Sequence, residues 1–260
     1  MQVACVTALL IGVAALPLAA QDAGQCRHEA ERSATVDANG ARRMLVAAGA
    51  GSLRIEGKPG LSAVRVRGRA CASSADLLEQ IRLTARRDGG DVVVEANRRD
   101  QQGGWNFRGN EYARLDLVME VPARMSADID DGSGEIELRN LGALEIDDGS
   151  GEIVGDELHG DVRIHDGSGG IRLTDVAGAL TIEDGSGEID LRNIGGVIDI
   201  EDGSGEIEIH GARRNVRIRD ASGSIDVSDI GGDFVVTDDG SGSIAYDDVR
   251  GRVDIPRKRR

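Results

Sequence analysis

Apolar residues recur along the second half of the chain in pairs two positions apart, with polar segments between the pairs. In residues 179–196 the pairs are Leu180 with Ile182 and Ile189 with Leu191. A spacing of two places both members on one face of a β-strand, a conformation that β-branched residues favour. Ile189 follows Ile182 by seven positions. The alternation therefore breaks there, and we expect a corner between two short strands.

The predicted corner coincides with a repeated tetrapeptide, Asp-Gly-Ser-Gly, which occurs once as Asp-Ala-Ser-Gly. Successive copies are 17, 18, 18, 18, 18 and 19 residues apart. They begin at Asp131, Asp148, Asp166, Asp184, Asp202, Asp220 and Asp239. Self-similarity at one period indicates a repeat architecture.

Two strands and two corners per period predict an all-β fold, a parallel β-solenoid (β-helix) in a single chain with about 18 residues per coil. Equivalent residues then stack about 4.8 Å apart. An antiparallel meander is the alternative, but it would not bring equivalent residues together and gives no reason for their identity. Stacking predicts one interior file of isoleucines, formed by Ile146, Ile164, Ile182, Ile200 and Ile218.

The sequence also indicates how the chain is organised. An uncharged, mostly apolar run ends in small residues at position 20, which is typical of a secretory signal peptide and too short for a spanning helix. We therefore expect a periplasmic or secreted protein with no transmembrane segment in the mature chain. The expected divisions are a signal peptide (1–20), an N-terminal segment (21–43), irregular solenoid coils with a cap (44–127), the regular solenoid (128–255) and a basic tail (256–260). A short helix at 77–80 is the expected cap.

The chain has three cysteines, one of which lies inside the predicted signal peptide. The mature chain would therefore keep Cys26 and Cys71. In an oxidising compartment two thiols can form a disulfide, and two separate buried thiols are the alternative.

Charge is unevenly distributed. The chain carries a net charge of −15, and residues 128–249 alone hold 31 acidic and 8 basic residues. Nucleic-acid binding needs an excess of Lys and Arg, so a nucleic-acid partner is excluded. A uniformly acidic array attracts cations and repels acidic polymers.

The aspartate that opens each tetrapeptide has two interpretations. At a corner, its side chain can accept a hydrogen bond from the backbone N–H two residues on, which forms an Asx-turn. A stacked file of carboxylates can instead bind Ca²⁺ weakly, so Asp131, Asp148, Asp166, Asp184 and Asp202 are candidate metal ligands. We favour the Asx-turn and expect no resident cofactor.

Three of the five aromatic residues fall in one stretch between two predicted strands: Trp105, Phe107 and Tyr112. The connection is long for a hairpin, and long loops are often functional. Flat aromatic rings with polar tips suit sugars or protein partners, so these residues form a candidate binding site. The alternative is that the rings fold back and cap the irregular end of the solenoid.

Catalysis finds little support in the residues. His165 occupies the position of Asp147 and Glu183 in adjacent coils, which favours a surface ion pair over general-base chemistry. The corner serines have no histidine beside them in the pattern, which argues against a nucleophilic triad. A β-helical carbohydrate-active enzyme, of the lyase or glycosidase type, is the alternative function.

The Asp-Gly-Ser-Gly-Glu-Ile repeats follow a less regular segment that ends Val118-Met119-Glu120-Val121-Pro122. Together they resemble the adhesin-like β-strand-repeat family of bacterial envelope proteins, over about residues 44–255. The resemblance implies a secreted or periplasmic solenoid and supplies no catalytic motif. We therefore expect a non-catalytic scaffold with an adhesion or binding role, whose partner is an envelope protein or a glycan.

Overall fold

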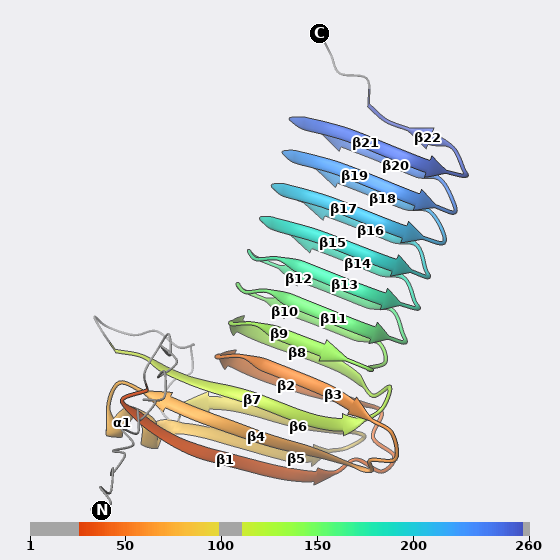
Figure 1. The fold of residues 1–260 in the computed structure, drawn as a ribbon. Helices are drawn as coiled ribbons and strands as arrows, with labels where there is room; N and C mark the ends of the chain where they lie inside the picture. Colours follow the sequence, from red (N-terminus) through yellow and green to blue (C-terminus); the bar gives the residue numbers. More distant parts are fainter. Residues whose placement is uncertain (1–25, 99–110, 257–260) are drawn as a thin grey trace, which may run out of the picture.

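The computed structural model describes residues 26–98 and 111–256, and it shows a parallel β-solenoid with two long sheets (Figure 1). The solenoid has about seven turns of about 18 residues, as the repeat predicts. Sheet A contains, in spatial order, β1 (His28–Asp37), β4 (Ala63–Ala72), β7 (Ala113–Pro122), β3 (Leu53–Lys58), β9 (Ile136–Arg139), β11 (Ile153–Leu158), β13 (Ile171–Val176), β15 (Gly187–Ile194), β17 (Gly205–Ala212), β19 (Gly223–Ile230) and β21 (Gly242–Val249). Sheet B contains β5 (Ile81–Asp88), β6 (Asp91–Arg98), β2 (Arg43–Ala50), β8 (Ser126–Ser133), β10 (Leu144–Asp148), β12 (Val162–Asp166), β14 (Leu180–Asp184), β16 (Ile198–Asp202), β18 (Val216–Asp220), β20 (Phe234–Asp239) and β22 (Val253–Asp254).

Equivalent residues of successive coils stack in register, which confirms the predicted interior file. Ile182 pairs with Ile164 on one side and with Ile200 on the other. All five isoleucines of the file are at least 98% buried. Burying a side chain of this size stabilises the fold by roughly 1.5–3 kcal/mol, so the stacked files supply the core of every coil.

The corner at each tetrapeptide brings successive backbones into very close contact. A Cβ atom added at Gly187 would overlap the carbonyl oxygen of Gly169 in the preceding coil. The same overlap with the preceding coil would occur at Gly205. The second glycine of the tetrapeptide is therefore required because only a residue without a side chain lets the coils stack at this corner.

The N-terminal strands do not follow the chain order of the regular coils. Strands β6 and β7 lie outside β2 and β3, which in turn lie directly against β8 and β9. The chain therefore leaves the solenoid after β3, builds the end of the molecule and returns past the β2–β3 coil to begin the regular repeat at β8.

Part of this region is also antiparallel, which corrects the expectation that residues 44–127 consist of irregular coils and a cap. Strand β4 pairs antiparallel with β1 and β7, and β5 pairs antiparallel with β6. Helix α1 (Ala75–Gln80) joins the two sheets here, and its N-cap Ser74 accepts a hydrogen bond from the amide of Leu77. The antiparallel strands give the end of the array a pairing pattern different from that of the coils. A repeat array needs such a distinct capping unit at its terminus.

No helix in the described part of the chain is long and apolar enough to cross a membrane.

Candidate functional site

The tetrapeptide aspartates form a buried file along sheet B, at the C-terminal ends of its successive strands. Strands β10, β12, β14, β16 and β18 share one burial pattern in which the first, third and fifth residues are buried. The fifth residue is the aspartate, so its side chain points inward with the apolar residues. Six members are at least 93% buried: Asp131, Asp148, Asp166, Asp184, Asp202 and Asp220. Each is in register with the aspartate of the next coil.

Four members of the file make the hydrogen bond expected for an Asx-turn, whereas neither carboxyl oxygen of Asp131 or Asp148 has a hydrogen-bond partner among the described residues. The Oδ1 atom of Asp202 accepts from the backbone N–H of Ser204 at 3.1 Å, and that of Asp220 accepts from Ser222 at 2.9 Å. Asp166 and Asp184 make the same contact at 3.2 Å. In Asp166, Asp184 and Asp202 the Oδ2 atom is buried without a hydrogen-bond partner among the described residues. In these three residues one carboxyl oxygen therefore fixes the corner, and the other is buried without a hydrogen bond from the described residues.

Burial raises the pKa of these carboxyl groups, and the neighbouring carboxylates of the file add to the effect. Desolvation, followed by the charge of Asp148, raises the pKa of Asp131 to about 7. The pKa values of Asp148 and Asp202 rise to about 6, although backbone N–H groups of their turns oppose the rise. The pKa values of Asp166 and Asp184 rise for the same reason, desolvation. The file therefore gains protons at a pH where exposed carboxylates are ionised.

Metal binding by this file stays a hypothesis. Within the described residues, no group of three or more His, Cys, Asp or Glu side chains is placed to hold a metal ion. A Ca²⁺ ion takes six to eight oxygen ligands. One aspartate per coil, with one of its oxygens already bonded to the turn, supplies few of them.

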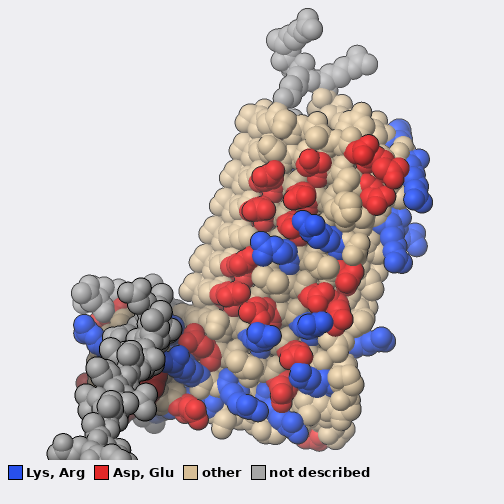
Figure 2. Space-filling view, in the orientation of Figure 1, with Lys and Arg blue, Asp and Glu red and all other residues tan. Residues whose placement is uncertain are grey.

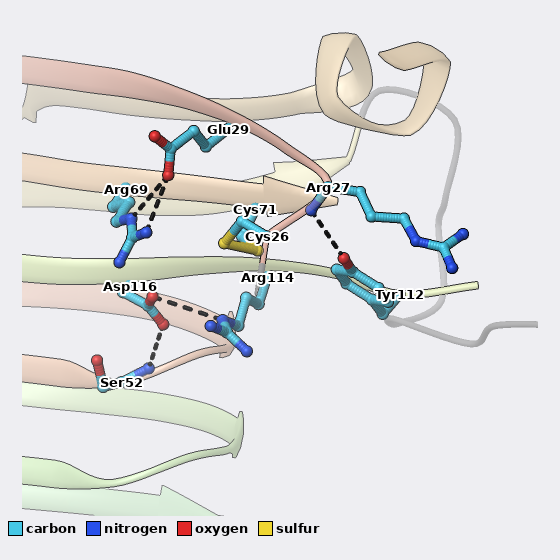
Figure 3. Close-up of a disulfide and its surroundings, with 9 residues drawn as sticks. All are labelled: Cys26, Arg27, Glu29, Ser52, Arg69, Cys71, Tyr112, Arg114 and Asp116. Atoms are coloured by element: carbon cyan, nitrogen blue, oxygen red, sulfur yellow. Dashed lines mark hydrogen bonds and ion pairs between the residues drawn. A yellow bond between two sulfur atoms is a disulfide. The ribbon is translucent and has the colours of Figure 1, made fainter. Parts of the chain in front are cut away.

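Of the three predicted aromatic site residues, Trp105 and Phe107 lie outside the described residues. Tyr112 lies at the start of β7, and its hydroxyl oxygen accepts a hydrogen bond from the backbone N–H of Arg27 at 3.1 Å (Figure 3). Its backbone exchanges two hydrogen bonds with Ser73: the amide of Ser73 donates to its carbonyl, and its own amide donates to the Ser73 hydroxyl. These contacts attach the end of the aromatic stretch to the N-terminal strands.

Beside Tyr112, Cys26 and Cys71 form a disulfide with a Cα–Cα distance of 5.4 Å (Figure 3). The bond joins Cys26, two residues before β1, to Cys71 at the buried end of β4. It therefore ties the edge strand of sheet A to its neighbour at the end of the molecule that lacks the regular repeat.

The histidines make surface contacts. His165 Nδ1 lies 3.5 Å from the Glu183 carboxylate of the next coil, a contact that becomes the predicted ion pair when the imidazole is protonated. His210 Nδ1 lies 2.8 Å from the Ser228 hydroxyl, a pair that the sequence analysis did not find. His210 and Ser228 are on the outer face of sheet A, and no carboxylate among the described residues contacts the His210 ring. The pair therefore lacks the third group that orients the base in a nucleophilic triad.

A surface groove that the sequence analysis missed crosses the outer face of β1, β4 and β7. Its volume is about 900 Å³, and its lining includes Arg67, Arg69, Glu31, Asp116 and Val118. Val118 is 51% exposed, one of three large apolar residues so exposed in the described chain. The alternation Arg65-x-Arg67-x-Arg69 is a sequence signal for it, because alternate residues of a strand share a face.

Charge separates this end of the molecule from the regular coils. Acidic side chains run in columns along the coils in Figure 2, and basic side chains are more frequent toward the N-terminal strands. The arrangement is that of a rod with an acidic body and a more basic end.

These features define a class of protein, a β-solenoid scaffold whose recurrent polar residues build corners. The Toastrack DUF4097 family matches residues 70–250, and the chain belongs to this family.

The chain is similar to several solved structures. A candidate adhesin from Bacteroides fragilis is 12% identical, with a TM-score of 0.50 over 88% of this chain and 98% of that one. A candidate adhesin from Parabacteroides distasonis is 11% identical, with a TM-score of 0.48 over 85% and 97% of the two chains. A candidate lipid-binding protein from the same species is 15% identical, with a TM-score of 0.47 over 89% and 98%. No curated protein matches the chain with significance.

Proposed function

We propose that this protein is a secreted or periplasmic, non-catalytic scaffold that binds an envelope glycan or protein. One observation carries the proposal: the repeated acidic residues, which would be the first candidates for chemistry, are used to build the solenoid. Asp184 and Asp202 point into the interior and fix their own turns, so they do not line an open cleft.

The outer surface supports binding rather than catalysis. Glycoside cleavage needs two carboxyl groups facing each other across a bound sugar. On the outer face of sheet A, carboxylates instead pair with neighbouring guanidinium groups. Glu137 lies 2.8 Å from Arg54, and Glu152 lies 2.6 Å from Arg172. Such exposed pairs contribute little stability, roughly 0–1 kcal/mol each, but they give the rod a surface of fixed charge on a rigid sheet.

The family relationship and the solved candidate adhesin of the same fold are consistent with this role. Adhesion, export and the compartment are part of the proposal, as is the predicted signal peptide over residues 1–20. Cell fractionation with N-terminal sequencing tests the export step, and the expected mature chain begins at Gln21. A cytoplasmic protein that retains Met1 would contradict it.

Immobilised protein exposed to a panel of envelope glycans and purified envelope proteins tests the binding role. We expect saturable retention of at least one class of ligand, unchanged when the exposed Glu201 of the regular coils is replaced by Gln. Absence of retention across the whole panel would contradict the proposed function.

A further inference from the structure

The groove over β1, β4 and β7 contains a guanidinium group, that of Arg67, which no carboxylate among the described residues contacts. Along the outer face of sheet A, the basic side chains of the described strands pair with carboxylates. Arg69 lies 2.9 Å from Glu29, and Arg65 lies 3.6 Å from Glu120. The same holds for Arg54, Lys58, Arg114, Arg139, Arg172 and Arg192. Arg67, between Arg65 and Arg69 on β4, has no carboxylate partner among the described residues.

The strand register explains why Arg67 is left unpaired. Its direct neighbours on the two flanking strands are Ser33 on β1 and Val118 on β7, and neither carries a charge. The nearest acidic positions are diagonal. Of these, Asp116 accepts a hydrogen bond from the amide of Ser52 and pairs with Arg114 (Figure 3). Its charge is therefore already engaged.

The residues around Arg67 offer three different kinds of contact. A guanidinium group forms two parallel hydrogen bonds with a carboxylate, the strongest geometry available to it. The Ser33 hydroxyl can donate hydrogen bonds to sugar hydroxyl groups and accept them, and the exposed carboxylate of Glu31 can accept them. Val118 offers an apolar surface beside them. A carboxylate, hydroxyl groups and an apolar C–H face occur together in an acidic sugar.

From this juxtaposition we infer that the groove over β1, β4 and β7 binds a carboxylate-bearing sugar of a glycan chain, with Arg67 holding the carboxylate. The inference rests on the proposed binding function and names its ligand class. Residues 128–249 carry 31 acidic and 8 basic residues, so they repel an acidic polymer along the rod. Binding is thereby restricted to the N-terminal end, and the coils extend away from the glycan.

The test uses the intact protein and three soluble probes: trigalacturonic acid, its fully methyl-esterified form and a hexaglutamate peptide. Saturation-transfer NMR detects contact, and titration calorimetry gives the affinity. Arg67→Gln removes the charge and keeps a side chain of similar length. Arg65→Gln is the matched control, because it lies on the same face of the same strand and its guanidinium is already paired with Glu120.

We expect trigalacturonic acid to bind the wild-type protein and the methyl ester to bind at least about tenfold more weakly, since the charge-assisted bonds are lost. Arg67→Gln should weaken binding by a similar factor, and Arg65→Gln should leave it within about twofold. Because Arg67 is exposed and unpaired, its replacement should leave the melting temperature unchanged.

Four results would overturn the inference: no binding of trigalacturonic acid, equal binding of the ester, equal loss with Arg65→Gln, or binding of hexaglutamate as tight as that of the sugar acid. The last would identify an acidic protein segment as the ligand. Retention of neutral glycans in the panel experiment, together with failure here, would leave the proposed function intact and remove only this ligand class.

Discussion

Replacing Asp202 by Asn separates the two roles of a buried aspartate, the turn hydrogen bond and the charge. The amide oxygen of Asn can still accept from the backbone N–H of Ser204, which now donates to Oδ1 at 3.1 Å. The substitution replaces the Oδ2 atom by an NH₂ group. Oδ2 is buried without a hydrogen-bond partner among the described residues. Its ionised form is the costly one, because Asp202 is 94% buried between Asp184 and Asp220.

The pKa of Asp202 fixes the size of the effect and its sign. Desolvation raises this pKa from 3.8 to about 6. Between these two values the folded protein binds more protons at Asp202 than the unfolded chain does, so the free energy of unfolding falls as pH rises. The penalty is absent below about pH 4 and complete above about pH 6. At 1.36 kcal/mol per tenfold change in proton affinity, it amounts to roughly 2–3 kcal/mol.

Asp202→Asn cannot ionise and therefore escapes this penalty. Urea unfolding followed by circular dichroism at pH 4 and pH 8 gives the free energy of unfolding of both proteins. The effect of the substitution should be roughly 2–3 kcal/mol more stabilising at pH 8 than at pH 4. Any cost of burying the amide NH₂ group is present at both pH values and cancels in this difference.

Asp199→Asn is the control, because Asp199 lies on the same strand and points to solvent. It measures what the loss of one exposed charge does in an acidic protein, and its effect should differ by less than about 0.5 kcal/mol between the two pH values. A pH-independent effect of Asp202→Asn would refute the reasoning, because it would mean that the carboxyl group ionises normally inside the fold.

The other predictions concern the core, the cation hypothesis, the disulfide and the aromatic stretch. Ile182→Ala should lower the free energy of unfolding by about 2–5 kcal/mol, because Ile182 is fully buried and a cavity remains; urea unfolding checks this, and a loss below about 0.5 kcal/mol would contradict the stacked core. Ca²⁺ at about 5 mM should shift the melting temperature of the wild type and of Asp184→Asn equally, whereas a larger rise in the wild type would establish the aspartate file as a cation site. Replacing Cys26 and Cys71 by Ser should lower stability by about 2–4 kcal/mol, because the disulfide closes a loop between residues 45 positions apart; an unchanged unfolding midpoint would contradict this. Emission of Trp105, the only tryptophan, distinguishes the two interpretations of its stretch: a red-shifted spectrum readily quenched by acrylamide is expected for a binding loop, and a blue-shifted, protected one for a cap.

The regular solenoid was predictable because its determinants are local and repeated. Each coil repeats the same spacing of apolar residues, so the inward position of Ile182 and the corner at Asp184 follow from the alignment of the copies. The inward orientation of the aspartate was not predicted. It extends the alternation that begins at Leu180 by one further step, from Ile182 to Asp184, into a residue type that is rarely buried.

The N-terminal end was harder to predict because its pairing is not local. Nothing in the residues of β2 and β3 specifies that β6 and β7 will lie on one side of them and β8 and β9 on the other. The same limit applies to the groove. The alternating arginines of β4 are visible in the sequence, but the position of Arg67 between Ser33 and Val118 depends on antiparallel registers that no repeat defines.

We propose above all that the solenoid is a binding scaffold and not an enzyme. Prolonged incubation of the purified protein with a panel of neutral and acidic envelope glycans, followed by measurement of new reducing ends and of unsaturated lyase products, tests it most directly. We expect the glycans to be retained by the protein and recovered intact. Accumulation of products that stops when a single carboxylate is replaced by its amide would contradict it and establish a carbohydrate-active enzyme.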